Sequence, residues 1–228
     1  MSQQEEDLRF ERKAYVDQIS RRSLISMVLQ HPALFTKIHK ERTVNSLYFD
    51  TPEFSDALEK INGLKSRKKV RIRWYGTVFG EIYKPVLEIK NKENGLGWKD
   101  RYPLHSFVIE DRGESAIQLE FKEPEGASRS QMFMMNRVPS SLVSYRRAYF
   151  QTADNRFRLT IDDQLMFFIP LRDSRGWVRI PDNTDGTIIE LKYSKDHDSD
   201  ARQITSWYPF RWGSFSKYTQ GLESSGLF

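Results

Sequence analysis

Charged residues recur at every second position in three consecutive segments between residues 68 and 104. In the first segment, VRIRW, Arg71 and Arg73 alternate with apolar residues. The second and third segments, LEIKNK and GWKDRY, show a similar alternation. Because successive side chains of a strand point to opposite faces, each segment is predicted to be a strand with one charged face. Arginine and lysine on such a face suit phosphate oxygens, and carboxylates among them suit Mg²⁺ or Mn²⁺.

The charged faces of these three predicted strands could be exposed to solvent, or they could line a channel inside the protein. In an open antiparallel sheet, one face packs on the core and the other is wet by solvent. In a closed sheet, the charged faces would line a channel that binds a polyanion. The strands predicted elsewhere in the chain distinguish between the two.

Four further segments, residues 8–16, 142–150, 157–168 and 187–193, carry the same signature and are also predicted to be strands. The basic residues on the charged faces, taken with Lys217 of the C-terminal segment, are Lys13, Arg71, Arg73, Lys90, Lys99, Arg101, Arg147, Arg158, Lys192 and Lys217. The acidic residues are Glu11, Glu88, Asp162 and Glu190. These faces carry more positive charge than the net +5 of the whole chain, so the remainder is close to neutral. A solvated face commonly mixes uncharged polar residues with both charges, so we favour faces that turn inward.

Two helices are predicted between the strands. Residues 18–30 place apolar residues on one stripe. A second helix begins at Pro52, with Asp50 or Thr51 as its cap, and ends near Asn62.

Other segments give weaker predictions. Residues 44–50 read as a further strand, and residues 114–123 as a strand or short helix. Residues 123–131 have the composition of a loop, and the methionine-rich residues 132–139 are predicted to be core. The aromatic segment 206–222 is predicted to cover the core.

Composition limits the class of protein. The chain has 228 residues and no cysteine, which excludes disulfides and thiolate sites. Its polar, acidic N-terminal residues do not read as a signal peptide, and no apolar run approaches the roughly 20 residues needed to span a bilayer. No repeat or linker is evident, so we predict a single domain over residues 1–228. We expect a soluble, cytoplasmic protein.

Short motifs along nearly the whole chain resemble those of one family. ERKAYV, NSLYFD, VRIRW, LEIKNK with KDRY, SYRRAYF with RLTID, IELKY and FSKY occur in the order seen in VTC domains. These are the polyphosphate polymerase domains of the vacuolar transporter chaperone complex and their bacterial relatives, within the CYTH-like triphosphate tunnel metalloenzymes. The resemblance implies an α+β fold: an antiparallel β-barrel, the triphosphate tunnel fold, with flanking helices.

The resemblance also implies roles for individual residues. Those implied as catalytic, phosphate-binding residues are Lys13, Arg71, Arg73, Lys90, Lys99, Arg147, Arg158 and Lys217. Arg101 and Lys192 are implied as further substrate contacts, and Asp162 is implied to line the same tunnel. Glu190 is implied as the main metal ligand, with Glu11 and Glu88 as further ligands. The family pattern Y-x-R favours Arg147 over Arg146 in SYRRAYF.

One window departs from the superfamily pattern. Many tunnel enzymes begin with E-x-E-x-K, whereas this chain reads RFERK, with Arg9 in place of the first glutamate. This difference favours the VTC branch over thiamine triphosphatases and adenylate cyclases. The chain also lacks the SPX domain and membrane helices of the fungal complex, so we expect any membrane coupling to come from a separate membrane-protein partner.

The expected activity is transfer of the γ-phosphate of ATP to a growing polyphosphate chain, with Mn²⁺ or Mg²⁺ as cofactor. The four histidines lie outside the strand motifs, which fits a reaction that needs no general base. Two alternatives remain open: an inorganic triphosphatase or nucleotide phosphohydrolase, and a non-catalytic module that binds polyphosphate or inositol phosphates. Nucleic acid is not an expected partner, because the basic residues form no recognisable RNA motif. The membrane partner could bring the protein to the inner face of a membrane.

Overall fold

The computed structural model describes residues 9–93, 96–112, 132–171, 176–181 and 186–226. The chain divides into two compact units, each made of three stretches. The first unit comprises Met1–Arg42, Tyr145–Leu165 and Asn183–Ser216, and the second comprises Thr43–Ser144, Met166–Asp182 and Lys217–Phe228. The single domain expected over residues 1–228 stays a prediction.

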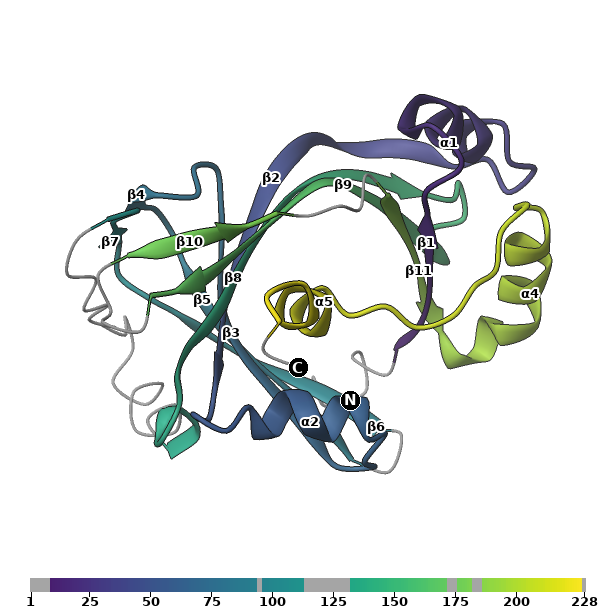
Figure 1. Ribbon diagram of the computed structural model, residues 1–228. Helices are drawn as coiled ribbons and strands as arrows, with labels where there is room; N and C mark the ends of the chain where they lie inside the picture. Colours follow the sequence, from purple (N-terminus) through teal and green to yellow (C-terminus); the bar gives the residue numbers. More distant parts are fainter. Residues whose placement is uncertain (1–8, 94–95, 113–131, 172–175, 182–185, 227–228) are drawn as a thin grey trace. The chain divides into compact units, whose positions relative to one another are not determined.

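The first unit is an antiparallel sheet with two helices. It contains β1 (Arg9–Val16), α1 (Arg21–Leu29), β11 (Thr187–Ser194), a 3-10 turn (Lys195–His197), α4 (Asp198–Ser206) and parts of β2 (Thr36–Asp50), β8 (Val138–Gln151) and β9 (Phe157–Pro170). Strand β11 pairs with β1 on one side and β9 on the other (Figure 1). In this register Glu190 lies opposite Lys13 on β1 and opposite Thr160 on β9.

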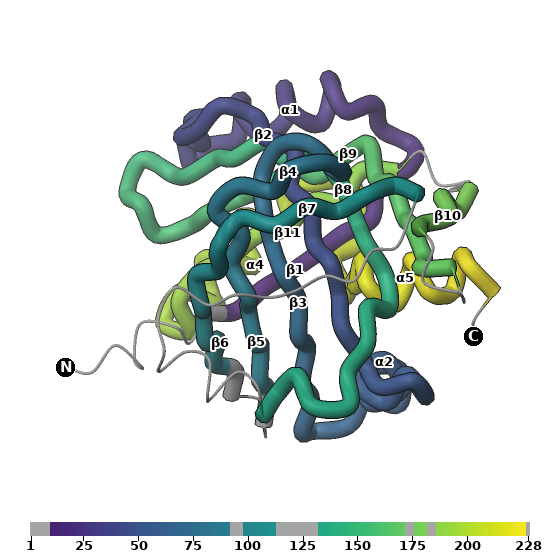
Figure 2. The backbone as a smooth tube through the Cα atoms, turned by 90° about the vertical axis from the view of Figure 1, so that its left-hand side faces the viewer, coloured from purple at the N-terminus to yellow at the C-terminus, as the bar shows by residue number. Residues whose placement is uncertain are grey.

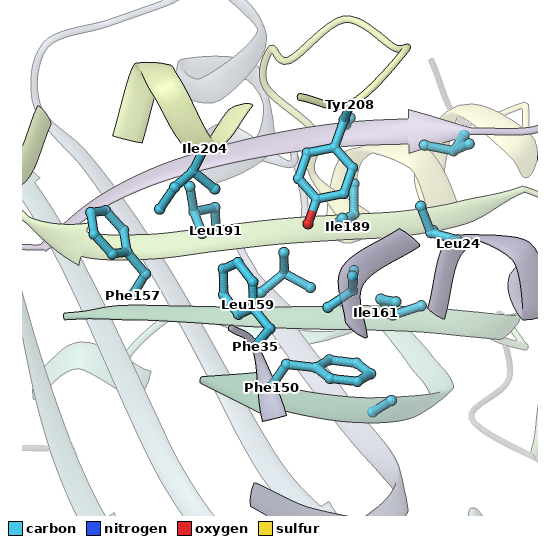
Figure 3. Close-up of a cluster of buried hydrophobic side chains, with 14 of the residues drawn as sticks. Leu24, Phe35, Phe150, Phe157, Leu159, Ile161, Ile189, Leu191, Ile204 and Tyr208 are labelled. Carbon is cyan, nitrogen blue, oxygen red and sulfur yellow. The ribbon is translucent and has the colours of Figure 1, made fainter. Parts of the chain in front are cut away.

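One face of this sheet is apolar. Leu159 and Ile161 of β9 and Ile189 and Leu191 of β11 are fully buried in one cluster, which Ile204 of α4 joins (Figure 3). Burying a large apolar side chain contributes about 1.5–3 kcal/mol, so this face stabilises the unit. The residues between them in sequence point to the other face, which carries the charges.

The second unit is built around three neighbouring strands. It contains α2 (Ser55–Ile61), β3 (Arg67–Tyr75), β4 (Gly80–Ile82), β5 (Val86–Glu93), β6 (Leu96–Pro103), β7 (Phe107–Ile109), β10 (Trp177–Ile180), α5 (Lys217–Ser224) and the remaining parts of β2, β8 and β9. Strands β3, β5 and β6 lie side by side in antiparallel register (Figure 2). Strands β4 and β7 form a separate pair.

The second unit also has one apolar face. Val70, Ile72 and Trp74 of β3 are each at most 1% exposed, as are Leu87 and Ile89 of β5. These residues alternate with Arg71, Arg73 and Glu88, as the sequence predicted. The charged residues therefore share the opposite face of the three strands.

The hydrogen-bonded strand order is β1-β11-β9-β8-β2-β3-β5-β6, with β10 paired to β9. The predicted class, α+β with an antiparallel sheet and flanking helices, is confirmed. Closure of a barrel requires the first and last strands to pair. No pairing joins β1 to β6 among the described residues, so the closure that we expected is not seen in the hydrogen-bond pattern.

Some elements differ from the prediction. Strand β2 begins at Thr36, whereas the sequence predicted a start at residue 44. The prediction missed the first half of the strand because this half is mostly exposed and shows no alternation of apolar residues. Met132 and Met135 are 64% and 66% exposed, so their assignment to the core is wrong. The predictions for residues 114–123 and 123–131 lie outside the described residues. No helix in the described part of the chain is long and apolar enough to cross a membrane.

Candidate functional site

Glu88 lies at the centre of the charged face of the second unit. Arg71 Nε and Nη2 donate to Glu88 Oε2 at 2.8 and 2.6 Å, and Arg73 Nη1 lies 3.6 Å from the same oxygen. Lys99 Nζ lies 2.6 Å from Oε1, and Arg101 Nε lies 3.7 Å from it. The basic residues of β3 thus approach one carboxylate oxygen and those of β6 approach the other.

Burial strengthens this cluster. Glu88 is only 4% exposed. Burial alone raises the pKa of its carboxyl group, but the charges of Arg71, Arg73 and Lys99 outweigh burial and hold the pKa far below its ordinary range. Burial lowers the pKa of the Lys99 ammonium to about 8, although Glu88 opposes this change. Glu88 is therefore an anion throughout the neutral pH range.

Helix α5 contributes an aromatic residue to the same face. The ring of Tyr218 stacks on Tyr48 with centroids 4.7 Å apart, and Lys69 Nζ lies 5.9 Å from the Tyr218 centroid. The hydroxyl of Tyr48 accepts a hydrogen bond from Arg71 Nη1 at 3.3 Å. Tyr218 in turn donates to Asp50 Oδ2 at 2.6 Å. The basic face is thereby continued onto the helix.

Two other predicted residues belong to the second unit. Lys90 of β5 lies between Lys69 of β3 and Lys99 of β6 in the strand register. Lys217 is the first residue of α5, next to Tyr218. Lys90 adds a basic residue to the strand that carries Glu88, and Lys217 adds one to the helix that carries Tyr218.

The charged face of the first unit has a different composition. Glu11 and Lys13 of β1 lie beside Glu190 and Lys192 of β11. Lys192 Nζ is 2.7 Å from Glu190 and 3.4 Å from Glu11, and Lys13 Nζ is 3.0 Å from Glu11 and 3.7 Å from Glu190. Each of the two lysines thus lies within ion-pair distance of both glutamates.

Arg147 and Asp162 form a buried ion pair on the same unit. Arg147 Nε and Nη2 donate to the two carboxylate oxygens at 2.5 and 2.6 Å. Burial lowers the pKa of Arg147, but the Asp162 carboxylate outweighs it and raises this pKa well above its ordinary value. The negative charge of Glu190 also raises the pKa of Arg147, by a smaller amount.

Arg158 and Thr160 follow one another on the charged face of β9. Arg158 is exposed, and it makes no ion pair or hydrogen bond within the described part of the chain. The Thr160 hydroxyl is buried beside Glu190 with no hydrogen-bond partner among the described residues. Both groups are available to an anionic or water ligand.

Arg146 belongs to a different cluster. It donates to Asp163 Oδ2 at 2.6 Å, and Arg21 Nε lies 3.0 Å from the same oxygen. Glu41 lies 2.7 Å from Arg21 Nη2. The predicted distinction between Arg147 and Arg146 therefore corresponds to two separate sets of partners. Arg21 of α1 thus forms ion pairs with both Asp163 and Glu41.

The carboxylates differ in how well they suit a divalent cation. Glu11 and Glu190 approach the same two ammonium groups, so a cation could take the bridging place of either lysine. No cluster of three or more His, Cys, Asp or Glu side chains occurs in the described residues, so water and substrate oxygens would have to complete the coordination. Glu88, in contrast, is surrounded by four basic side chains that would repel a metal ion. The donor set fits a metal ion at Glu11 and Glu190 and does not fit one at Glu88.

The predicted residues therefore fall into two sets. The second unit holds Arg71, Arg73, Glu88, Lys90, Lys99, Arg101 and Lys217. The first unit holds Glu11, Lys13, Arg147, Arg158, Asp162, Glu190 and Lys192. That all of them line one lumen stays a prediction.

Sequence reasoning missed Tyr48, Lys69 and Tyr218 as members of the charged face. Lys69 continues the alternation of Arg71 and Arg73 by one step, so this signal was present. The place of Tyr218 depends on where α5 packs, which no local pattern reveals.

Several solved structures share this fold. A putative adenylate cyclase from Bacillus halodurans has a TM-score of 0.55 and 15% identity, over 93% of this chain and 96% of its own. The PH1819 protein of Pyrococcus horikoshii OT3 has a TM-score of 0.54 and 9% identity, over 96% and 98%. A putative adenylate cyclase from Vibrio parahaemolyticus has a TM-score of 0.50 and 12% identity, over 94% and 98%. The chain thus shares its overall fold with these three proteins.

The family is defined by sequence. A family model described as "VTC domain" matches residues 8–225. The chain therefore belongs to the VTC domain family, which confirms the resemblance seen in its sequence motifs. A search of curated proteins found no match.

Proposed function

We propose that the protein is a polyphosphate polymerase that transfers the γ-phosphoryl group of ATP to the end of a growing polyphosphate chain. Membership in the VTC domain family supports this proposal. The observation that carries it is the convergence of Arg71, Arg73 and Lys99 on a single point of the second unit. Polyphosphate presents anionic oxygens on every phosphate, and several converging donors suit such a chain.

In this proposal, the second unit binds the phosphate chain. Planar guanidinium groups donate two hydrogen bonds in one plane, which matches two oxygens of a phosphate. The Nε–H of Arg73 is buried and has no acceptor among the described residues, so it can donate to a ligand oxygen. Arg101 is 67% exposed at the side chain and can contact phosphates farther along the chain.

For the first unit, we propose that its charged face contacts phosphate oxygens and a metal ion. Lys13 and Lys192 would contact phosphate oxygens, as would Arg158, which makes no ion pair with any of the residues that the structure describes. Glu11 and Glu190 would hold Mn²⁺ or Mg²⁺, which when bound neutralises charge on the transferred group. Arg147 Nε and Nη2 already donate to the buried Asp162 carboxylate, so these two donors are not available to a phosphate.

The reaction needs no proton acceptor from the protein. The attacking terminal phosphate oxygen is already anionic near neutral pH, so positioning and charge stabilisation suffice. Every predicted carboxylate, Glu11, Glu88, Asp162 and Glu190, lies within ion-pair distance of a basic side chain. A hydrolase would need one of them to take a proton from water, and such pairing makes each a poor base. This observation favours transfer to phosphate over hydrolysis.

The decisive experiment is incubation of the protein with γ-labelled ATP and Mn²⁺, followed by sizing of the labelled product. A ladder of labelled chains is expected. Labelled orthophosphate alone would establish a phosphohydrolase, and retained, unreacted ATP would establish a binding module. Omission of Mn²⁺ and Mg²⁺ is the matched control and should abolish the ladder.

The expected partners follow from this proposal. ATP and inorganic polyphosphate or triphosphate are the substrates, and nucleic acid is not one. A membrane-protein partner, and with it a place at the inner face of a membrane, stays a prediction.

A further inference from the structure

Glu88 divides its two oxygens between two strands. Oε2 accepts both hydrogen bonds from Arg71 of β3, and Oε1 forms an ion pair with the ammonium group of Lys99 of β6. Strand β5, which carries Glu88, lies between β3 and β6. The carboxylate therefore holds basic side chains from both neighbouring strands at one point.

Burial makes this arrangement necessary for the basic residues. The side chains of Arg71, Arg73 and Lys99 are 11%, 17% and 18% exposed, so little water screens their mutual repulsion. Without a central anion, these groups would turn away from one another or take up a counter-ion. Glu88 supplies that anion before any substrate arrives.

We propose that Glu88 is a positioning residue, not a metal ligand. It keeps the donors of Arg71, Arg73 and Lys99 converged in the substrate-free protein, so that a phosphate chain meets an arranged face. The effect on turnover rests on the proposed polymerase function, whereas the effect on binding of metal-free triphosphate does not. Glu88 should at the same time weaken the binding of phosphate, because its permanent negative charge repels the phosphate that it helps to orient.

Two substitutions separate charge from position. Glu88→Gln removes the charge at nearly constant size, and Glu88→Asp keeps the charge but withdraws it by one methylene. Glu53→Gln is the control, because Glu53 is exposed in the same unit and makes no interaction in the described part of the chain. Circular dichroism first establishes that each variant is folded.

The effect on the binding of metal-free triphosphate is measured by calorimetry with inorganic triphosphate in the presence of EDTA. Glu88→Gln should bind about tenfold more tightly than the wild type, the ratio that corresponds to about 1.4 kcal/mol. Glu88→Asp should restore the wild-type affinity to within about twofold. Equal affinity of the Gln variant and the wild type would overturn the proposal.

The effect of the substitutions on catalysis is measured as turnover with ATP and Mn²⁺. At saturating ATP, kcat should fall at least about tenfold in Glu88→Gln and by a smaller factor in Glu88→Asp. A Gln variant whose kcat recovers at high Mn²⁺, with half-saturation shifted about tenfold, would make Glu88 a metal ligand and overturn the proposal. Should the wild type itself show no turnover, the polymerase function fails, and the calorimetric comparison still decides the role of Glu88. If Glu88→Gln does not fold, a wild-type-like kcat in Glu88→Asp overturns the positioning role.

Discussion

The guanidinium group of Arg147 donates to both carboxylate oxygens of Asp162, on the neighbouring strand of the sheet. Asp162 is 0% exposed and Arg147 is 8% exposed, so both charges of the pair are buried. A buried pair that loses one partner leaves an uncompensated charge.

Asp162→Asn should therefore lower the free energy of unfolding by about 3–5 kcal/mol. Urea unfolding followed by circular dichroism measures the change. Asp154→Asn is the control, since Asp154 pairs with Arg156 at an exposed site and should matter far less. Equal destabilisation by the two substitutions would contradict the importance of the buried pair.

Glu190→Gln tests the metal site. The variant should keep the fold and bind metal-free triphosphate as well as the wild type or better, since it loses a charge that repels phosphate. Its Mn²⁺-dependent turnover should fall by orders of magnitude, because metal stabilisation of the transferred group is worth several kcal/mol.

Arg73→Ala is the contrasting variant, which should weaken triphosphate binding with or without metal. A Glu190→Gln variant with full turnover would reduce Glu190 to an ion-pair partner of Lys192, from which it lies 2.7 Å away.

Tyr218→Phe tests the attachment of α5 within the second unit. The hydroxyl donates to the buried Asp50 carboxylate at 2.6 Å, and hydrogen bonds to charged groups contribute about 1.5–3 kcal/mol. The variant should lose stability of this size in a thermal or urea melt. Tyr83→Phe is the matched control, because the Tyr83 hydroxyl donates to Glu81 in an exposed position and should have little effect. A Tyr218→Phe variant as stable as the control would refute this role.

His31 should make the first unit less stable in acid. Its Nδ1 accepts a hydrogen bond from the Ala33 amide at 2.9 Å, and Nε2 faces the Ile204 carbonyl at 3.2 Å, so the ring is held neutral. Burial lowers the pKa of His31 below its ordinary value of 6.5. The unfolded chain then takes up a proton more readily than the folded one. The stability from the neutral ring is present above pH 6.5 and is lost as the pH falls below it.

Melting temperatures at pH 7.5 and 5.5 check this expectation. His31→Gln should lower the melting temperature at pH 7.5 and reduce the further drop at pH 5.5. His39→Gln is the control, since His39 is exposed, and it should keep the wild-type drop. The idea fails if both variants behave alike.

The sequence predicted those parts of the fold that depend on local alternation. Val70, Ile72 and Trp74 are buried. Arg71 and Arg73 point to the opposite face, because successive side chains of a strand alternate between its two faces. The exposed half of β2 gave no such pattern, and its pairing comes from its neighbours. Helix α4 buries Ala201, Ile204 and Thr205 at helical spacing, a signal that the surrounding aromatic residues obscured.

The site shows the same limit. Alternation identified which residues carry charge on each face, but it could not say which charges neutralise one another. Glu88 and Glu190 look alike in sequence, each between two apolar residues. Four basic groups surround Glu88, whereas Glu190 shares two lysines with another carboxylate, and this difference arises from strand register.

Asp50 ends strand β2, and its carboxylate accepts four hydrogen bonds, one of them from the neighbouring Thr51 amide. The amides of Asp56 and Ala57 in α2 donate to its two oxygens, as does the hydroxyl of Tyr218 in α5. One side chain thus joins the end of a strand to two helices. Slow amide hydrogen exchange should accordingly report α2 and α5 opening together as one cooperative segment, at a free energy below that of global unfolding.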